Sequence, residues 1–301
     1  MLSRKDVRVQ QVQTLLNTGF LPVSVDYRLC PEISLLEGPM HDVCHALKWA
    51  RTVLPTMPLQ RKDIRVNGDK IVAVGWSTGG HVAMSLAWTA PNIGIKAPDA
   101  ILAFYCPTDY EDEFWSLPNI PEGSLKNGTT LPPFDKDIWE GVYDKPITAY
   151  NPPPAKRALG GWMTLDDARS RIALYMNWAG KTVDVLVNGL NPATKSPSTS
   201  SQPFPGIPKP STEQVQSISP LAQIRHGNYK TPTFIIHGTR DDLIPWQQAQ
   251  RTYEALVEKG VEAEVRIVEG AVHLFDLYRG GDVGKMGEVV EEGYQWLQKF
   301  V

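Results

Sequence analysis

Ser77 lies in a glycine-rich run with the spacing that nucleophilic acyl chemistry requires. The run is Gly75-Trp76-Ser77-Thr78-Gly79-Gly80, and it follows a β-branched apolar segment and precedes a helical pattern. A sharp strand-to-helix turn presents a serine hydroxyl clear of a sheet, and side chains at Gly75 and Gly79 would collide with backbone there. The pattern predicts Ser77 as a nucleophile. It also predicts that the N–H of Thr78, at the start of the next helix, donates to an oxyanion.

A serine hydroxyl needs a base, and the base needs an orienting group. The stretch His237-Gly-Thr-Arg-Asp241-Asp242 follows one predicted strand, and Glu269-Gly-Ala-Val-His273 follows the next. Acid and histidine therefore both lie at carboxyl ends of strands, where open α/β sheets bind ligands. We expect Asp241 to orient His273 and His273 to be the base, with Asp242 as the alternative acid.

Other residues near these positions have less specific readings. We expect His237 to bond loop backbone and Asp276 to be a surface or loop-capping group. The candidates for substrate contact are Trp76, His81 and Trp246. For His81, packing within its helix is the alternative.

Strands alternate with helical patterns along most of the chain, which predicts a doubly wound α/β sheet. Five short apolar runs read as buried parallel strands, starting at Phe20, Lys70, Ala100, Thr233 and Ala263. The helical patterns between and around them span residues 7–17, 40–53, 81–88, 247–259 and 283–300.

Residues 106–230 interrupt this alternation, because they contain no convincing strand. The segment is rich in proline and tryptophan, with one helical pattern from Thr164 to Leu190 and a loop-like stretch from Pro192 to Ser211. Aromatic residues are rare in disordered chains, so we expect an ordered cap inserted after the third visible strand. The predicted organisation is a core of residues 1–105 and 231–301 with a cap of residues 106–230. We expect its aromatic side chains to form core more often than they face substrate.

Composition limits the remaining functions. The 301 residues are 42% hydrophobic and 21% charged, and the net charge is −3, which argues against a nucleic-acid partner. No apolar run approaches the roughly 20 residues of a membrane span, and the first residues have no signal-like core. Three cysteines without metal-ligand spacing predict reduced thiols in a cytoplasmic protein, with no metal and no cofactor.

Several stretches resemble the serine α/β-hydrolase superfamily. The segment from Val25 to Glu32 is similar to the DYRLxPE run of the hormone-sensitive-lipase branch. Longer stretches resemble the carboxyl-terminal thioesterase or release domains of fungal non-reducing polyketide synthases, namely SRKDVR, GFLPVSVDYRLCPE, GWSTGGHVAMSLAWTAP, ILAFYCPTDYED, KTPTFIIHGTRDDLIPWQQ and HLFDLYRG. This resemblance implies hydrolysis or transfer of an acyl group from an ester or thioester, which a carrier protein can present.

The sequence departs from the lipase branch at one place. That branch has an HGG loop that supplies oxyanion N–H groups, and no HGG occurs in these 301 residues. The resemblance implies a missing strand between the Phe20 and Lys70 strands, so the two would either pair directly or destabilise the protein. We therefore expect this chain alone to be weakly active or inactive, and poorly soluble. Two alternatives follow, a non-catalytic binding protein that keeps the pocket and a truncated fragment of a longer enzyme.

Overall fold

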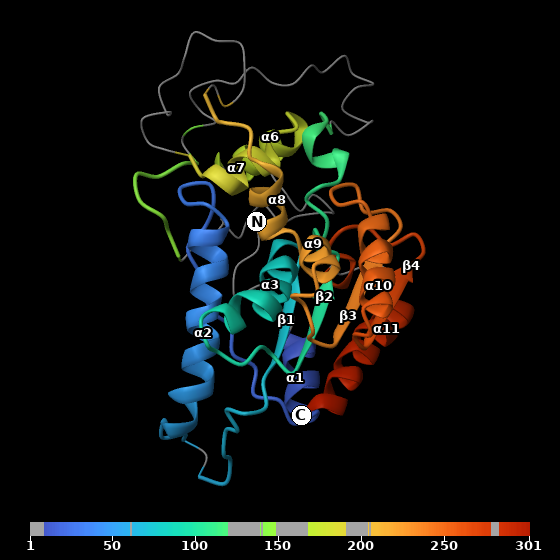
Figure 1. The fold of residues 1–301 in the computed structure, drawn as a ribbon. Coiled ribbons are helices and arrows are strands. Elements are labelled where there is room, and N and C mark those ends of the chain that lie inside the picture. The colour runs from blue at the N-terminus through green and yellow to red at the C-terminus, as the bar shows by residue number, and fades with distance from the viewer. Residues whose placement is uncertain are drawn as a thin grey trace. The chain divides into compact units, whose positions relative to one another are not determined.

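Four parallel strands form the sheet that carries the predicted site, in the order β1-β2-β3-β4 (Figure 1). The computed structural model describes residues 9–60, 62–119, 139, 141–148, 168–190, 204, 206–277 and 283–301. The strands are β1 (Val72–Trp76), β2 (Ala100–Phe104), β3 (Thr233–Gly238) and β4 (Ala263–Val268). Their carboxyl ends meet at one edge because the register pairs Trp76 with Phe104 and Phe104 with Ile236.

Burial differs between the inner and outer strands. Every residue of β2 and β3 is buried, as expected for strands covered on both faces. Most residues of β1 and all of β4 are only half-buried, since each lies at an edge of the described sheet. The four predicted strands that begin at Lys70, Ala100, Thr233 and Ala263 are therefore confirmed, with the outer two less covered than their sequences indicate.

The fifth predicted strand, at Phe20–Tyr27, is wrong. Residues 20–29 have no helix or strand assignment, and Leu21, Val23 and Val25 are 46%, 45% and 38% exposed. A strand exists only through ladder hydrogen bonds to a neighbour, and the described part of the chain offers this segment none. Direct pairing between this segment and β1 is likewise not observed.

Helices cover both faces of the sheet (Figure 1). Helix α11 packs on β2 and β3, where Phe234 meets Trp296, and α1 contacts α11. Helices α3 and α10 cover the other face, with α2 against α3 and α9 against α10. The bounds of these helices are α1 (Val9–Asn17), α2 (His41–Thr52), α3 (Thr78–Asn92), α9 (Pro220–Arg225), α10 (Gln247–Glu258) and α11 (Val283–Leu297). None of the helices in the described ranges has the length and apolarity needed to cross a membrane.

Chain contacts divide the molecule into two units, each described here by itself. The unit with the sheet contains residues 6–25, 40–109 and 219–301, and the other contains residues 1–5, 26–39 and 110–218. Helices of the second unit are α6 (Ala168–Trp178), α7 (Thr182–Asn188) and α8 (Thr212–Ile218). Short turns of helix complete the two units, namely η1 (Leu36–Met40), η2 (Leu54–Thr56), η3 (Glu113–Ser116), η6 (Phe275–Leu277) and η7 (Gln298–Phe300).

The second unit has an apolar core and a buried ion pair. Trp139, Tyr175 and Phe204 pack together with aliphatic residues of α6 and α7, so these cap aromatics are core. Glu32, in the DYRLxPE-like run, pairs with Arg169 of α6, and both side chains are at most 2% exposed. Arg169 also donates to the carbonyl oxygen of Cys30 at 2.8 Å. The motif thus holds its own loop to α6.

The predicted helix from Thr164 to Leu190 is wrong as a single helix. It is broken between α6 and α7, and residues 164–167 lie outside the described ranges. Gly180 lies in the break with a φ of +64°, and a Cβ there would lie 2.6 Å from the carbonyl oxygen of Ser116. Only glycine tolerates that backbone and that approach, which ends α6. Helices α8 and α9 were not predicted, and most of the stretch from Pro192 to Ser211 lies outside the described residues.

Candidate active site

Ser77 occupies a strained turn between β1 and α3. Its φ is +53° and its ψ is −130°, a conformation that L-residues rarely adopt. A Cβ at Gly75 would lie 2.1 Å from the carbonyl oxygen of Gly79, and one at Gly80 would lie 2.7 Å from the Cβ of Cys106. Glycine at 75 and 80 therefore lets strand and helix approach closely enough to form the turn. The steric need at Gly75 was predicted from sequence, whereas that at Gly80 was not.

Ser77, His273 and Asp241 form one chain of hydrogen bonds. His273 Nε2 lies 2.9 Å from Ser77 Oγ, and His273 Nδ1 lies 2.7 Å from Asp241 Oδ2. The carboxylate can only accept, so Nδ1 carries the proton and Nε2 accepts from the Ser77 hydroxyl. The His273 side chain is 1% exposed and the Asp241 side chain 0% exposed. The three residues are therefore arranged for proton transfer from serine to histidine.

Four hydrogen bonds hold the Asp241 carboxylate. Oδ1 accepts from the backbone N–H groups of Leu243 and Ile244, at 2.9 and 3.0 Å. Oδ2 accepts from His273 and from His237 Nε2, the latter at 3.0 Å. Burial raises the pKa of Asp241, but hydrogen bonds from the two histidines outweigh it and hold the pKa well below its usual range. The carboxylate therefore stays ionised in the neutral pH range.

His237 has a larger part in the site than its sequence position indicated. Its Nε2 lies 3.1 Å from the carbonyl oxygen of Ile244, the expected loop contact, and also within hydrogen-bond distance of Asp241. Both neighbours only accept, so Nε2 carries the proton and shares it between them. His237 thus binds the same Asp241 oxygen as His273. The adjacent Asp242, by contrast, is exposed.

The loops that carry Asp241 and His273 are joined directly. Arg240 N–H donates to the carbonyl oxygen of Ala271 at 2.9 Å, and Gly270 N–H donates to Thr239 Oγ1 at 2.8 Å. A Cβ at Gly238 would lie 2.2 Å from the Ala271 carbonyl oxygen. Gly238 therefore allows the two loops to approach each other closely, a steric requirement that was not predicted from the sequence.

The three residues predicted to contact substrate have different surroundings. Trp76 donates its indole N–H to Asp276 at 2.9 Å and stacks on Phe104. His81 is fully buried within α3, and Trp246 is half-buried where α10 begins. That these residues bind substrate stays a prediction.

The expectation that Asp276 is a surface or capping group is wrong. Its side chain lies in η6 and the residue is only 4% exposed. It accepts hydrogen bonds from Gln11, Trp76 and Tyr105, which belong to three separate parts of the chain. No sequence signal pointed to this cluster, because its members are between 171 and 265 residues from Asp276.

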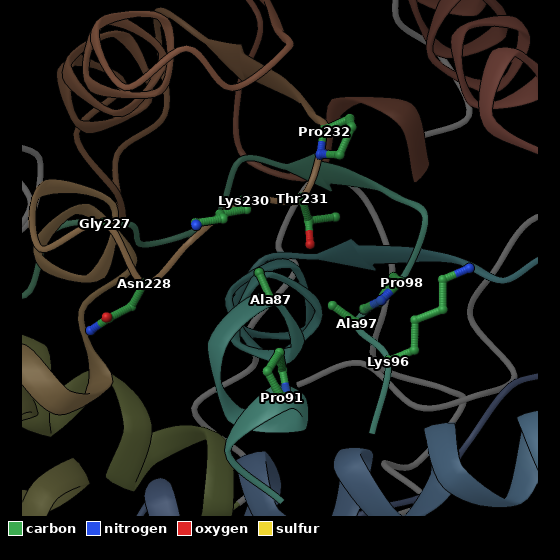
Figure 2. Close-up of a pocket in the computed structure, with 10 residues that line it drawn as sticks. All are labelled: Ala87, Pro91, Lys96, Ala97, Pro98, Gly227, Asn228, Lys230, Thr231 and Pro232. Carbon is green, nitrogen blue, oxygen red and sulfur yellow. The ribbon is translucent and has the colours of Figure 1, made fainter. Parts of the chain in front are cut away.

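A separate hollow lies at the amino ends of the strands, away from Ser77. It has a volume of about 450 Å³ and is bordered by α3, the segment before β2 and the segment before β3 (Figure 2). Its lining includes Lys96 and Lys230 and three prolines. The Lys96 ammonium is paired with Asp99 at 2.5 Å. This hollow contains none of the predicted site residues.

Comparison with known proteins agrees with this architecture. Residues 12–150 match a family described as alpha/beta hydrolase fold, and residues 183–301 match the prolyl oligopeptidase family. An alpha/beta hydrolase superfamily protein from Enterococcus faecalis superposes with a TM-score of 0.57 at 13% identity, over 99% of this chain and 85% of that one. A thermostable esterase from Pseudomonas putida gives a TM-score of 0.56 at 16% identity, over 97% and 68% of the two chains.

Sequence relatives are much closer. The non-reducing polyketide synthase adrD of Penicillium roqueforti is 58% identical over 100% of this chain and 12% of its own length. The 5-methylorsellinic acid synthase of Aspergillus terreus is 55% identical over 99% of this chain and 11% of its own. This chain thus spans only about an eighth of these curated relatives. The chain has the α/β-hydrolase fold, and in sequence it is similar to a segment of fungal non-reducing polyketide synthases.

Proposed function

We propose that this chain is a serine hydrolase that cleaves acyl esters or thioesters through an acyl-enzyme on Ser77. The supporting observation is the hydrogen-bonded sequence Ser77–His273–Asp241 on the turn between β1 and α3. A hydroxyl with a lone-pair nitrogen 2.9 Å away, and a carboxylate behind that nitrogen, is the arrangement that activates a serine.

The reaction follows from these contacts. His273 Nε2 takes the Ser77 proton while Oγ attacks the acyl carbonyl carbon. The N–H of Thr78, in the first turn of α3, has no acceptor within the helix and donates to the oxyanion. The tetrahedral intermediate expels an alcohol or thiol, which takes the proton from Nε2. Water or an acceptor alcohol then gives its proton to His273, attacks the acyl-enzyme and releases Ser77 with its proton restored.

The two histidines around Asp241 serve this cycle in different ways. His273 becomes an imidazolium in each half-reaction, and the ionised Asp241 stabilises that charge at 2.7 Å. His237 donates to the Asp241 carboxylate and holds it in place. The low pKa of Asp241 keeps it ionised throughout.

We further propose an aromatic acyl thioester, delivered by a carrier protein, as the substrate. The support is the similarity to polyketide synthases, one of which is named for 5-methylorsellinic acid, an aromatic acid. Carrier proteins hold such groups as thioesters.

Turnover of a benzoyl and an acetyl thioester with the same leaving thiol tests both parts. Ser77→Ala is expected to lose about 10³-fold or more in kcat. Ser85→Ala, on the same helix, is the matched control because Ser85 Oγ only bonds the Val82 carbonyl oxygen. Wild-type protein is expected to turn over the benzoyl thioester faster than the acetyl thioester.

Three results would count against these proposals. Unchanged turnover in Ser77→Ala would remove Ser77 as nucleophile. Faster turnover of the acetyl thioester would favour a general carboxylesterase over a polyketide-type thioesterase. Specific binding of the benzoyl thioester with no turnover would favour the non-catalytic alternative.

A further inference from the structure

Asp276 is a buried carboxylate three residues beyond the proposed base, and its three side-chain hydrogen bonds come from neutral donors. Oδ2 accepts from Gln11 Nε2 at 2.8 Å and from Trp76 Nε1 at 2.9 Å, and Oδ1 accepts from the Tyr105 hydroxyl. Among the residues that the structure describes, no lysine, arginine or histidine forms an ion pair with it. Burying a carboxylate without a cation is costly, even where hydrogen bonds satisfy it.

The donors connect this carboxylate to both halves of the proposed catalytic machinery. Trp76 precedes Ser77 in the chain, so its bond to Asp276 ties the nucleophile turn to η6. Tyr105 follows β2, and its ring lies edge-on to the His273 ring with centroids 4.8 Å apart. Asp276 therefore reaches Ser77 through one donor and His273 through another.

Backbone and ring contacts fix the position of Tyr105 beside His273. Its φ is +34°, its side chain is fully buried, and its N–H donates to the Ile236 carbonyl oxygen at 2.6 Å. The Phe275 and Tyr105 rings pack in a T-shaped arrangement, with their centroids 5.7 Å apart. Burial, followed by the charge of Asp276, raises the pKa of Tyr105 well above its usual value, so its hydroxyl keeps its proton and donates.

We propose that Asp276 is a positioning residue for His273 whose buried negative charge also favours the imidazolium formed during acyl transfer. The inference rests on the proposed function of Ser77. The groups that face His273 include Asp241 at Nδ1, Ser77 at Nε2 and Tyr105 at the ring. Tyr294 also lies near Asp276, where burial and then the Asp276 charge raise its pKa, so it carries no charge. Asp276 is thus the second anion of the site, after Asp241.

Asp276→Asn separates the charge from the shape of the side chain. The amide oxygen can still accept from Gln11 and Trp76, and the amide nitrogen can donate to a rotated Tyr105 hydroxyl. The packing therefore survives while the charge is lost. Loss of the charge destabilises the imidazolium. The acid limb of the kcat/KM profile is therefore expected to move down by about 0.5–1 pH unit.

The expected kinetic signature is a fall in kcat of about tenfold with KM changed less than twofold, because the charge acts on the transition state. Tyr105→Phe keeps the ring on His273 and the Asp276 charge, so kcat is expected to fall about threefold with the acid limb unmoved. Asp242→Asn removes an exposed neighbouring charge and is the matched control, with no change in the acid limb.

Three outcomes separate the possibilities. An unmoved acid limb and unchanged kcat in Asp276→Asn would overturn the inference and leave Asp276 as a structural residue. If Asp276→Asn does not fold, unchanged kcat in Tyr105→Phe would overturn it instead. Full activity in Ser77→Ala would overturn both this inference and the proposed function, whereas an inactive Ser77→Ala beside an unaffected Asp276→Asn would overturn this inference alone.

Discussion

Two loops flank the His273 imidazole, and each brings a buried carboxylate to the site by a different route. The loop after β3, residues 239–246, holds Asp241 largely by itself, because the N–H groups of Leu243 and Ile244 bind one carboxylate oxygen. The loop after β4, residues 269–277, carries Asp276, whose side-chain donors lie in other parts of the chain. The donors to Asp276 come from α1, β1 and the residue after β2.

This difference separates a locally built site from one that depends on the assembled fold. Asp241 receives three of its four hydrogen bonds from its own loop and from the adjacent His237. Asp276 is satisfied only when α1 and the ends of two strands are in place around it. We therefore expect changes in the first loop to act mainly on chemistry, and changes that separate the loops to act on stability and chemistry together.

The largest expected effect distinguishes Asp241 from its neighbour. In Asp241→Asn the amide oxygen can still accept from the backbone N–H groups of Leu243 and Ile244. That orientation turns the amide nitrogen towards both histidines. His273 Nδ1 must then accept, so the proton moves to Nε2 and the base cannot take the Ser77 proton. We expect a fall in kcat of about 10⁴-fold. Asp242→Asn, measured in the same thioester assay, is expected to change kcat little, and a larger loss there would reverse the assignment.

The approach of the two loops gives the next effect. In Gly238→Ala, the new Cβ would press on the Ala271 carbonyl oxygen and force the loops apart. We expect a loss of about 1–3 kcal/mol in the free energy of unfolding, measured with urea, and about 10²-fold in kcat.

Gly287→Ala is the matched control for Gly238→Ala. A Cβ at Gly287, in α11, meets nothing within 4 Å. Alanine is expected to stabilise this helix by up to about 1 kcal/mol. Equal effects of the two substitutions would show that the approach of the loops does not matter.

His237 tests how much of the Asp241 geometry depends on the second histidine. His237→Leu removes the donor that lies 3.0 Å from Asp241 Oδ2, whereas His237→Gln retains an N–H donor of different reach. We expect kcat to fall about tenfold in His237→Leu and less in His237→Gln, since the backbone bonds to Oδ1 remain. A leucine variant with wild-type kcat would make His237 a loop residue only.

The smallest expected effect is on stability at acid pH. The pKa of Asp241 is depressed in the folded state, so its contribution to stability is present above the ordinary aspartate pKa of about 3.9. The contribution is lost as the pH falls towards the lower folded-state value. Urea unfolding at pH 7 and pH 3 is expected to show a larger loss in wild type than in Asp241→Asn. Equal losses in the two proteins would contradict the depressed pKa.

The contrast between the loops also explains what could be predicted from the sequence. Asp241, His273 and Ser77 belong to short stretches whose spacing has a steric or chemical reason, so the pattern can be recognised in the sequence. Four strands were predicted for the same reason, because each is a short run rich in apolar residues. The segment at Phe20 has that pattern too, but a strand also needs a partner, which no local pattern reveals.

The missed features are the ones that depend on distant neighbours. Asp276 was read as a surface group because its three donors are far away in sequence. The single helix from Thr164 to Leu190 was wrong because the break at Gly180 is set by the backbone of Ser116. Gly238 was overlooked because its steric need comes from Ala271, on another strand's loop.

The most direct test of the account is to locate the site of covalent labelling by a fluorophosphonate probe, using mass spectrometry of the digested protein. Such probes react with a serine only where a base and oxyanion donors activate it. The account predicts one adduct, on the peptide that contains Ser77, and no adduct in Ser77→Ala under the same conditions. An adduct on any other residue, or labelling of the Ser77→Ala protein at the wild-type rate, would contradict it.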